Sequence, residues 1–270
     1  MRHHLSFDVE DVYQGFKERG IRGWTKDVDG EKKRINEILD LLEKYNQKAT
    51  FFILTEVLKD YKQEVLDMKS RGHEVASHGH EHLRIWRRNP KEFSEDIKQS
   101  KDLLESLISK EVKGYRAPGF SLNESTLWAA ELIQNAGFTY SSSSSFTELK
   151  LPPSLCLRKS EDTEGKLVEF PATSVRILGA DARICGGFYF RALPLRVTEL
   201  LMRKQESLNK SVNVYLHPFE FEENPVKLKS SLKVSVIRYH NIDKTKTRFE
   251  QLLQRHSFTS FEESLPRFPS

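Results

Sequence analysis

Short runs of β-branched and aromatic residues alternate along this chain with segments whose apolar residues recur every three or four positions. The first pattern predicts buried strands, and the second predicts amphipathic helices. Within residues 31–45, for example, Ile35, Ile38, Leu39 and Leu42 have helical spacing. The patterns predict strands at 4–9, 49–54, 73–77, 112–116, 138–142, 167–171 and 212–216. They predict helices at 31–45, 59–71, 89–109, 123–135, 195–208 and 243–255.

Turn and capping residues mark several of these boundaries. Gly72 is expected to end the second predicted helix, and Pro90 lies in the first turn of the third. Asn123 is expected to cap the helix that follows it, with Gly137 just beyond the end of that helix. Asp243 is the expected N-cap of the last helix.

The order of these elements, strand followed by helix, is typical of parallel sheets with crossover helices. No stretch of the chain has the composition of a linker, so residues 1–270 are expected to form one α/β domain. The pattern is compatible with a barrel and with a doubly wound sheet.

Composition and charge exclude several classes of protein. The chain has 270 residues and a net charge of +4, which is too small to favour nucleic-acid binding. No apolar run approaches 18 residues, so no transmembrane segment is expected. The first residues do not resemble a signal peptide, and Cys156 and Cys185 show no pairing pattern. These features predict a cytoplasmic protein whose two thiols are reduced core residues.

Four of the predicted strands end in polar residues that are unusual beside a buried strand. In parallel α/β folds the carboxyl ends of the strands meet at one face and carry the active residues. These ends are therefore expected to form one site. They read Asp8-Val9-Glu10-Asp11, Ser77-His78-Gly79-His80-Glu81-His82, Tyr115-Arg116-Ala117-Pro118 and Tyr215-Leu216-His217-Pro218.

The acidic end of the first strand is a candidate metal-binding and catalytic segment. Residues two apart in an extended segment share a face, so Asp8 and Glu10 can point at the same site. Buried carboxylates are costly unless they are paired or bound to a metal. The alternative is a solvated turn in which Asp11 caps a short helix.

Four of the nine histidines fall between positions 73 and 82. On a helical turn His78 and His82 would share one face, and two imidazoles with one carboxylate resemble a catalytic zinc site. The alternative is a solvated, histidine-rich turn. His80 is expected to be exposed or to face the substrate, and His73 to be a core or surface residue. The spacing from His73 to His78 is one residue too long for the His-Glu-x-x-His motif of zinc peptidases.

Three further residues at the strand ends could take part in catalysis. Arg116 beside a carboxylate would keep it ionised and oriented, although an ordinary surface arginine is equally compatible with the sequence. Gly119 leaves a backbone N–H accessible to an oxyanion. His217 could support the site structurally or act as a general acid.

Together these residues resemble the NodB-type polysaccharide deacetylases, carbohydrate esterase family 4. Motifs of that family recur here in order, as Ser6-Phe7-Asp8-Val9-Glu10-Asp11, His78-x-x-x-His82, Arg116-Ala117-Pro118 and Leu216-His217. A subgroup associated with exopolysaccharide clusters is more similar still. It shares the Asp-Val-Glu-Asp opening, Gly-Gly-Phe at 186–188, Tyr-Leu-His-Pro at 215–218 and Tyr-His-Asn-Ile-Asp-Lys-Thr at 239–245.

The resemblance implies a distorted (β/α) barrel and a divalent metal, usually zinc. The implied metal ligands are His78, His82 and either Glu10 or Asp11, of which the i, i+2 spacing to Asp8 favours Glu10. Catalytic and substrate-binding roles are implied for the following residues: Asp8 as base, Arg116 orienting Asp8, Gly119 as oxyanion donor, His217 as acid, and Pro118, Tyr140 and Phe188 in substrate binding.

The implied reaction is hydrolysis of the N-acetyl amide of an amino sugar in a glycan, with acetate as a product. One departure concerns the fourth motif, where relatives usually have Tyr-Asp-Ser-Ser and this chain has Tyr140-Ser141-Ser142-Ser143. Two alternatives stay open, of which this departure favours the second. The first is a related metal-dependent amidohydrolase acting on a non-sugar amide or on a lipid-linked sugar. A lipid-linked substrate would place the protein peripherally at a membrane. The second is a glycan-binding protein without activity.

Overall fold

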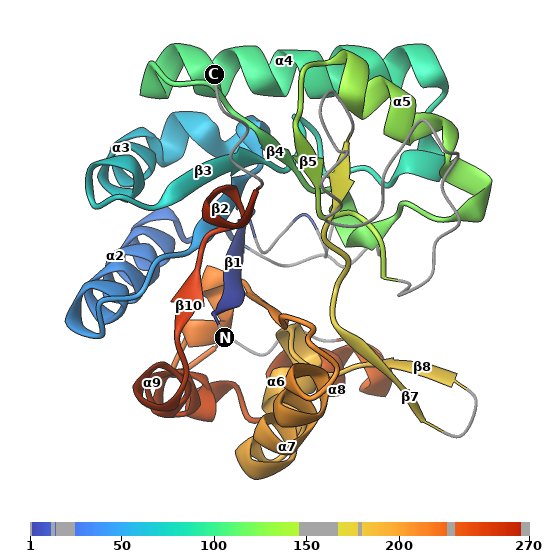
Figure 1. The fold of residues 1–270 in the computed structure, drawn as a ribbon. Helices are drawn as coiled ribbons and strands as arrows, with labels where there is room; N and C mark the ends of the chain where they lie inside the picture. Colours follow the sequence, from blue (N-terminus) through green and yellow to red (C-terminus); the bar gives the residue numbers. More distant parts are fainter. Residues whose placement is uncertain are drawn as a thin grey trace.

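A curled parallel sheet surrounded by helices forms the body of the protein (Figure 1). The computed structural model describes residues 2–11, 14, 25–145, 167–177, 180–225 and 230–265. The strands of the main sheet are β1 (His3–Val9), β2 (Thr50–Ile53), β3 (Glu74–Ser77), β4 (Gly114–Tyr115), β5 (Tyr140–Ser141), β6 (Val168–Glu169), β9 (Asn213–Leu216) and β10 (Phe258–Thr259). The α-helices are α2 (Val28–Lys44), α3 (Lys62–Ser70), α4 (Pro90–Ile108), α5 (Trp128–Asn135), α6 (Gly187–Ala192), α7 (Leu195–Glu206), α8 (Leu232–Tyr239) and α9 (Thr245–Arg255).

The order of the strands distinguishes a barrel from a doubly wound sheet. Strands β1 to β6 lie side by side in chain order, all parallel, and β9 and β10 both return to pair with β1. A doubly wound sheet would instead reverse its strand order at a switch point. The distorted (β/α) barrel that the resemblance implied is therefore confirmed. A separate antiparallel hairpin, β7 (Ser174–Ile177) with β8 (Ala180–Arg183), lies outside this sheet.

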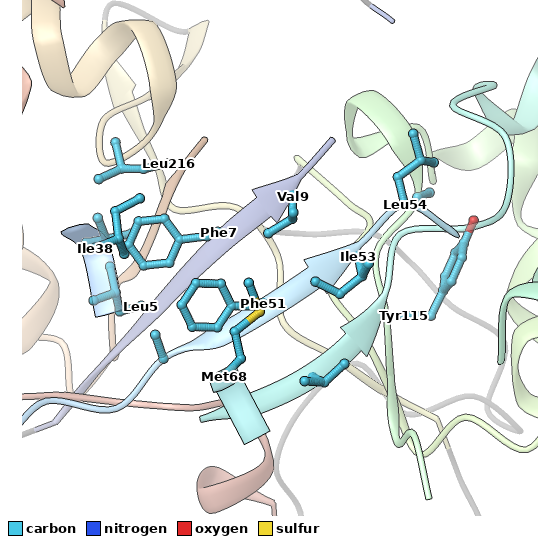
Figure 2. Close-up of a cluster of buried hydrophobic side chains, with 14 of the residues drawn as sticks. Leu5, Phe7, Val9, Ile38, Phe51, Ile53, Leu54, Met68, Tyr115 and Leu216 are labelled. Atoms are coloured by element: carbon cyan, nitrogen blue, oxygen red, sulfur yellow. The ribbon is translucent and has the colours of Figure 1, made fainter. Parts of the chain in front are cut away.

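The core lies between the strands and the outer helices. Phe7 on β1 and Phe51 on β2 are adjacent in the sheet register, and their rings stack with centroids 5.1 Å apart. Figure 2 shows Ile38 of α2 beside Phe7 and Met68 of α3 beside Phe51. Strands with buried residues on both faces are typical of a parallel sheet covered by helices. This packing fixes the carboxyl ends of β1, β2 and β3 at one rim.

Two predicted helices are interrupted and one predicted cap is wrong. The segment predicted as a helix at 59–71 forms a 3₁₀ helix, Thr55–Asp60, followed by α3, and the segment after Asn123 likewise divides into a 3₁₀ turn, Glu124–Thr126, and α5. Asp243 is not the N-cap of α9, because it lies inside another 3₁₀ turn, Ile242–Lys244, and Lys244 takes the cap position.

Several short elements were not predicted. They are α6, α8, β7, β8 and β10. Strand β10 has two residues, and α8 has no buried side chain, so neither leaves a clear hydrophobic period in the sequence. Cys185 is buried with a free thiol, whereas Cys156 lies outside the described residues. None of the described helices is long and apolar enough to cross a membrane.

Replacing Phe51 by Ala should lower the free energy of unfolding by about 3–5 kcal/mol, because it opens a cavity under the stacked Phe7 ring in a fully buried site. Urea denaturation followed by circular dichroism measures the change. The matched control is Leu200→Ala on the exposed face of α7, which should change the value by no more than about 0.5 kcal/mol. Equal losses in the two variants would contradict this account of the core.

Candidate metal and catalytic site

The carboxyl ends of β1, β3, β4 and β9 meet around one cavity. The cavity has a volume of about 570 Å³, and the side chains of Asp8, Glu10, His78, His82 and His217 line it. Because the strands are parallel and β1 lies between β2 and β9, residues from distant parts of the chain arrive at the same rim. The structure thus brings together the polar strand ends that the sequence singled out.

Glu10, His78 and His82 form a compact group. The Oε2 atom of Glu10 lies 2.7 Å from Nε2 of His82 and 3.4 Å from Nε2 of His78. The prediction that His78 and His82 share a helical turn is wrong, because residues 78–82 form an irregular bend after β3. Gly79 in this bend has a φ of +85°, a conformation that glycine adopts without strain.

The hydrogen bonding of His78 indicates that the group suits a cation. Nδ1 of His78 lies 2.8 Å from the backbone carbonyl oxygen of Arg116. A carbonyl oxygen only accepts, so Nδ1 carries a proton, and in the neutral form of this ring Nε2 would present a lone pair toward Glu10. A lone pair and a carboxylate oxygen at 3.4 Å repel each other unless a proton or a cation lies between them. Two imidazole nitrogens and one carboxylate oxygen are a donor set that fits a catalytic divalent metal with an open position.

Glu10 rather than Asp11 belongs to this group. Burial by itself would raise the pKa of Glu10, but His82, His78 and His217 outweigh it and hold that pKa well below its usual range. Asp11 instead lies 3.6 Å from the Nζ atom of Lys26. Of the two carboxylates left open by the sequence, only Glu10 lies within contact of both imidazoles in the described part of the chain.

Arg116 is fully buried, and its guanidinium binds the carboxylate of Asp8. Its Nη1 donates to Oδ1 of Asp8 at 2.6 Å, and Nη2 donates to the hydroxyls of Ser6 and Ser142 at 2.9 and 3.0 Å. Its Nε donates to the Ser142 carbonyl at 3.2 Å, and its guanidinium lies 4.0 Å from the centroid of the Phe52 ring. The sequence left open whether Arg116 was a surface residue, and its burial excludes that alternative.

The fourth-motif segment supports Arg116 without an aspartate. At the position where relatives have Asp, Ser141 is buried and its hydroxyl donates to that of Ser143 at 2.8 Å. The next residue, Ser142, supplies two acceptors to Arg116. The backbone N–H groups of Ser143 and Ser144 both donate to the buried carboxylate of Glu169 at 2.7 Å. Serines and Glu169 thus order this segment.

His217 is held by a carboxylate that the sequence reading did not identify. Oε2 of Glu220 accepts from both the ring Nδ1 and the backbone N–H of His217, at 3.1 and 3.0 Å. The Nε of Arg191 donates to the other oxygen of Glu220 at 2.8 Å. The signal available in the sequence was only an acid three residues after His217 in a turn, Pro218–Phe221.

Charge in this network sets the protonation of His217. Burial would lower the pKa of His217, but Glu220, Glu10 and Asp8 raise it to about 9, so the ring is protonated at neutral pH. Burial would raise the pKa of Glu220, but His217 and Arg191 lower it to about 2. The Nε2 atom of His217 lies 3.9 Å from Oδ2 of Asp8 and 3.9 Å from Oε1 of Glu10, facing the candidate metal group.

Of Gly119, Phe188 and Pro118, three residues predicted to contact the substrate or the oxyanion, two line the cavity. Gly119 and Phe188 line the cavity, whereas buried Pro118 is not among its described lining residues. Gly119 has a φ of +67°, and an added Cβ would lie 2.8 Å from Nε of Arg84, so a side chain there would be strained and crowded. The position of Gly119 therefore requires glycine.

Three further residues lie away from the cavity. Tyr140 was predicted to bind substrate, but it is fully buried and its hydroxyl donates to Glu74 at 2.8 Å, so it does not reach the site. His80, expected to be exposed or to face the substrate, instead hydrogen-bonds through Nδ1 to the Thr55 hydroxyl at 3.0 Å and is half-buried. His73 is a core residue, and burial lowers its pKa to about 4.

Comparison with known proteins yields two family matches that together cover most of the chain. Residues 26–140 match the model of the polysaccharide deacetylases, and residues 150–266 match a domain of unknown function, DUF3473. Asp8 and Glu10 precede the first match and His217 lies in the second. The candidate site therefore draws on both matched segments and on the residues before them.

Curated relatives match shorter parts of the chain. Peptidoglycan-N-acetylmuramic acid deacetylase PdaC of Bacillus subtilis is 35% identical over 81 residues, which are 30% of this chain and 16% of that protein. Peptidoglycan-N-acetylglucosamine deacetylase of Bacillus cereus is 31% identical over 96 residues, 35% of each protein. The matched region thus spans about a third or less of the length of these relatives.

Solved structures share the fold across the whole chain. A protein from Mycobacterium smegmatis assigned as a polysaccharide deacetylase has a TM-score of 0.62 at 16% identity, covering 99% of this chain and 92% of that one. BA3943, a carbohydrate esterase family 4 pseudoenzyme from Bacillus anthracis, has a TM-score of 0.52 at 12% identity, covering 97% and 64%. The chain therefore contains a segment, residues 26–140, that matches the polysaccharide deacetylase family, and its fold is similar to that of solved carbohydrate esterase family 4 proteins.

Proposed function

We propose that this protein is a zinc-dependent deacetylase that hydrolyses the N-acetyl amide of an amino sugar in a glycan. The observation that carries the proposal is the arrangement of the cavity. A donor group suited to a divalent metal, an oriented carboxylate and a protonated histidine face one another there. The relatives named as peptidoglycan deacetylases support a glycan as the substrate class. The motifs shared with the subgroup associated with exopolysaccharide clusters favour a role in exopolysaccharide production.

The metal would be held by Glu10, His78 and His82, whose facing acceptor atoms fit a divalent cation. When bound, zinc polarises the acetyl carbonyl and makes water more acidic. Nitrogen ligands with one carboxylate favour zinc over the oxygen-preferring magnesium and calcium. The backbone N–H of Gly119, at the cavity wall, is proposed to donate to the oxyanion.

Asp8 and His217 move the protons in this proposal. Arg116 occupies Oδ1 of Asp8, which leaves Oδ2 toward His217 and the cavity to take a proton from the attacking water. The water oxygen bonds to the amide carbon, and the carbon–nitrogen bond then breaks. His217 gives the proton on Nε2 to the departing nitrogen, while Glu220 holds Nδ1. The products are acetate and a free amino sugar.

The same geometry supports an active enzyme more than a binding protein without catalysis. The missing fourth-motif aspartate was the reason to consider inactivity, yet Arg116 has acceptors for its Nε, Nη1 and Nη2 atoms without it. We also propose that the chain forms one domain. Strand β1 is paired both with β2 from the first matched segment and with β9 and β10 from the second, so neither segment completes the sheet alone.

Replacing His82 by Ala should abolish tight zinc binding, because it removes one of three ligands. The wild-type protein should retain about one zinc ion per chain after dialysis, as measured by inductively coupled plasma mass spectrometry. His80→Ala is the matched control, since it removes an imidazole from the same bend that contacts Thr55 rather than Glu10, and it should retain zinc. Zinc lost equally from both variants, or retained in His82→Ala, would contradict the proposed ligand set.

Replacing Asp8 by Asn should lower the rate of acetate release from N-acetylglucosamine oligosaccharides by about 10²–10⁴-fold, because the variant cannot accept a proton. A coupled acetate assay measures the rate, and the zinc content should be unchanged. Full activity in Asp8→Asn would exclude Asp8 as the base. A zinc-loaded wild-type protein that releases no acetate from these oligosaccharides would instead refute the proposed function.

Replacing Glu220 by Gln should reduce kcat about 10-fold or more while KM stays within about 2-fold. The neutral Gln side chain orients the His217 ring less well and stabilises its protonated form less. Steady-state acetate release separates the two constants, and the zinc content should not change. The control is Glu222→Gln, which removes a nearby carboxylate that lies 3.2 Å from Nη1 of Arg34. A change in KM alone would show that Glu220 does not act through His217.

A further inference from the structure

Two sequence motifs supply none of the proposed metal ligands, proton donors or proton acceptors. Gly-Gly-Phe at 186–188 lies at the start of α6, and Tyr-His-Asn-Ile-Asp-Lys-Thr at 239–245 begins at the last residue of α8. The two helices lie side by side (Figure 1), and the side chain of Arg191 on α6 reaches the carboxyl end of α8. Arg191 is therefore the residue at which the two motifs meet.

Arg191 is buried, and its guanidinium bonds two different parts of the protein. Its Nε donates to Oε1 of Glu220 at 2.8 Å. Its Nη2 donates to the backbone carbonyl of Ile237 at 2.8 Å, and its Nη1 donates to the carbonyls of His240 and Arg238 at 2.8 and 3.2 Å. One guanidinium thus binds a carboxylate and the backbone of a helix at the same time.

The bonds from Arg191 are a main anchor of α8. Most helices are held by the burial of an apolar face, but none of the eight side chains from Leu232 to Tyr239 is buried. The last carbonyl groups of an α-helix have no partner within the helix, and the helix dipole favours a cation at this end. Arg191 satisfies these carbonyls, and the guanidinium of Arg238 adds a contact with the Phe219 ring.

Helix α8 forms one wall of the cavity that contains the candidate metal group. Four of its side chains line this cavity: Lys233, Val234, Ile237 and Arg238. The same guanidinium leads to the proposed acid, because Glu220 accepts from Arg191 through Oε1 and from His217 through Oε2. Two buried side chains, Arg191 and Glu220, therefore connect the wall of the cavity to His217.

The two motifs hold Arg191 in this position. Gly186 forms a parallel bridge with Tyr215 on β9, and a Cβ at Gly186 would lie 1.9 Å from the Tyr215 ring. This close approach requires glycine, and it lets α6 begin directly against the strand that leads to the proposed acid. In the second motif, the Asn241 side chain donates to the backbone carbonyl of Arg191 at 3.1 Å, next to the His240 carbonyl that accepts from the guanidinium.

We propose that Arg191 is a positioning residue that couples the α8 wall to the proposed acid, so that substrate binding against α8 and proton transfer from His217 depend on one guanidinium. The proposal deepens the proposed function and rests on it, because His217 is the acid of that reaction. Arg191 acts through Glu220 and through the backbone of α8, to which its nitrogen atoms are bonded.

Replacing Arg191 by Gln should lower kcat about 10-fold or more and raise KM about 5-fold or more, because it releases both Glu220 and α8. Steady-state acetate release by the zinc-loaded enzyme from N-acetylglucosamine oligosaccharides measures both constants. Glu220→Gln should change mainly kcat, whereas Ile237→Ala, which removes a side chain of the wall, should change mainly KM. The control is Arg71→Gln, which removes an arginine bound to Asp40 at 2.7 Å and should change neither constant more than about 2-fold.

A double-mutant cycle distinguishes action through Glu220 from general damage to the fold. In the Glu220→Gln background, Arg191→Gln should still raise KM but lower kcat by no more than about 2-fold further, because the link to His217 is already broken. Independent losses of kcat that multiply in the double variant, or an unchanged KM in Arg191→Gln, would overturn the proposal.

The conservative variant Arg191→Lys keeps the test decisive if circular dichroism shows that Arg191→Gln does not fold. Lysine keeps a cation beside Glu220 but lacks the planar array that bonds several carbonyls at once. It should therefore preserve kcat better than KM. Equal effects on the two constants in Arg191→Lys would count against the coupling.

Two measurements that need no substrate keep this test separate from that of the proposed function. In zinc-loaded Arg191→Gln, the amides of residues 232–240 should exchange with deuterium about 10-fold or more faster than in the wild type. The Nδ1 proton of His217, identified in the NMR spectrum by its loss in His217→Ala, should shift in Arg191→Gln. If both changes are found but no oligosaccharide releases acetate, the coupling stands and the proposed reaction fails. If either is missing, the coupling is refuted whatever the enzyme does.

Discussion

Arg116 connects the elements on which the site depends. Its side chain holds Asp8 and Ser6 of β1 together with Ser142 after β5, and its backbone carbonyl accepts the Nδ1 proton of His78. Its own N–H donates to Ser77 of β3 at 2.8 Å. One residue therefore orients the proposed base and, by accepting from Nδ1 of His78, leaves Nε2 of that ring facing the candidate metal position. Arg116 thus fixes Asp8 and His78, the proposed base and proposed metal ligand, relative to each other.

Burying this arginine has a physical cost that the surrounding residues offset. A fully buried guanidinium is unfavourable unless its donors are bonded, and breaking a buried ion pair typically costs about 3–5 kcal/mol. Here Asp8, two serine hydroxyls and a carbonyl accept its hydrogen bonds, while Phe52 lies against its face. This explains how the segment at Ser141 can lack the aspartate usual in relatives: the arginine is already satisfied, and Glu169 orders the serine backbone instead.

The sequence predicts those parts of the site that follow from the periodicity of a parallel sheet. Once β1, β3, β4 and β9 are assigned, their carboxyl ends must meet, so Asp8, His78 and Arg116 are predicted to be neighbours. Spacing alone does not predict the route of the chain between ligands, and His78 and His82 meet through an irregular bend rather than a helical turn. Nor does it show that the Tyr140 hydroxyl points to Glu74, away from the cavity.

Features that depend on tertiary packing leave a weaker trace in the sequence. In the sequence nothing distinguishes Glu220 from other acidic residues, because only the turn after β9 brings it to His217. Helix α8 is not predicted because it has no buried face. Both lie in the segment that matches the domain of unknown function, whereas His78, His82 and Arg116 lie in the deacetylase match. The two histidines of the candidate metal group thus come from one matched segment, and the proposed acid and its carboxylate come from the other. Because β1 pairs with strands of both segments, the packing around β1 sets the distance between His217 and the candidate metal group.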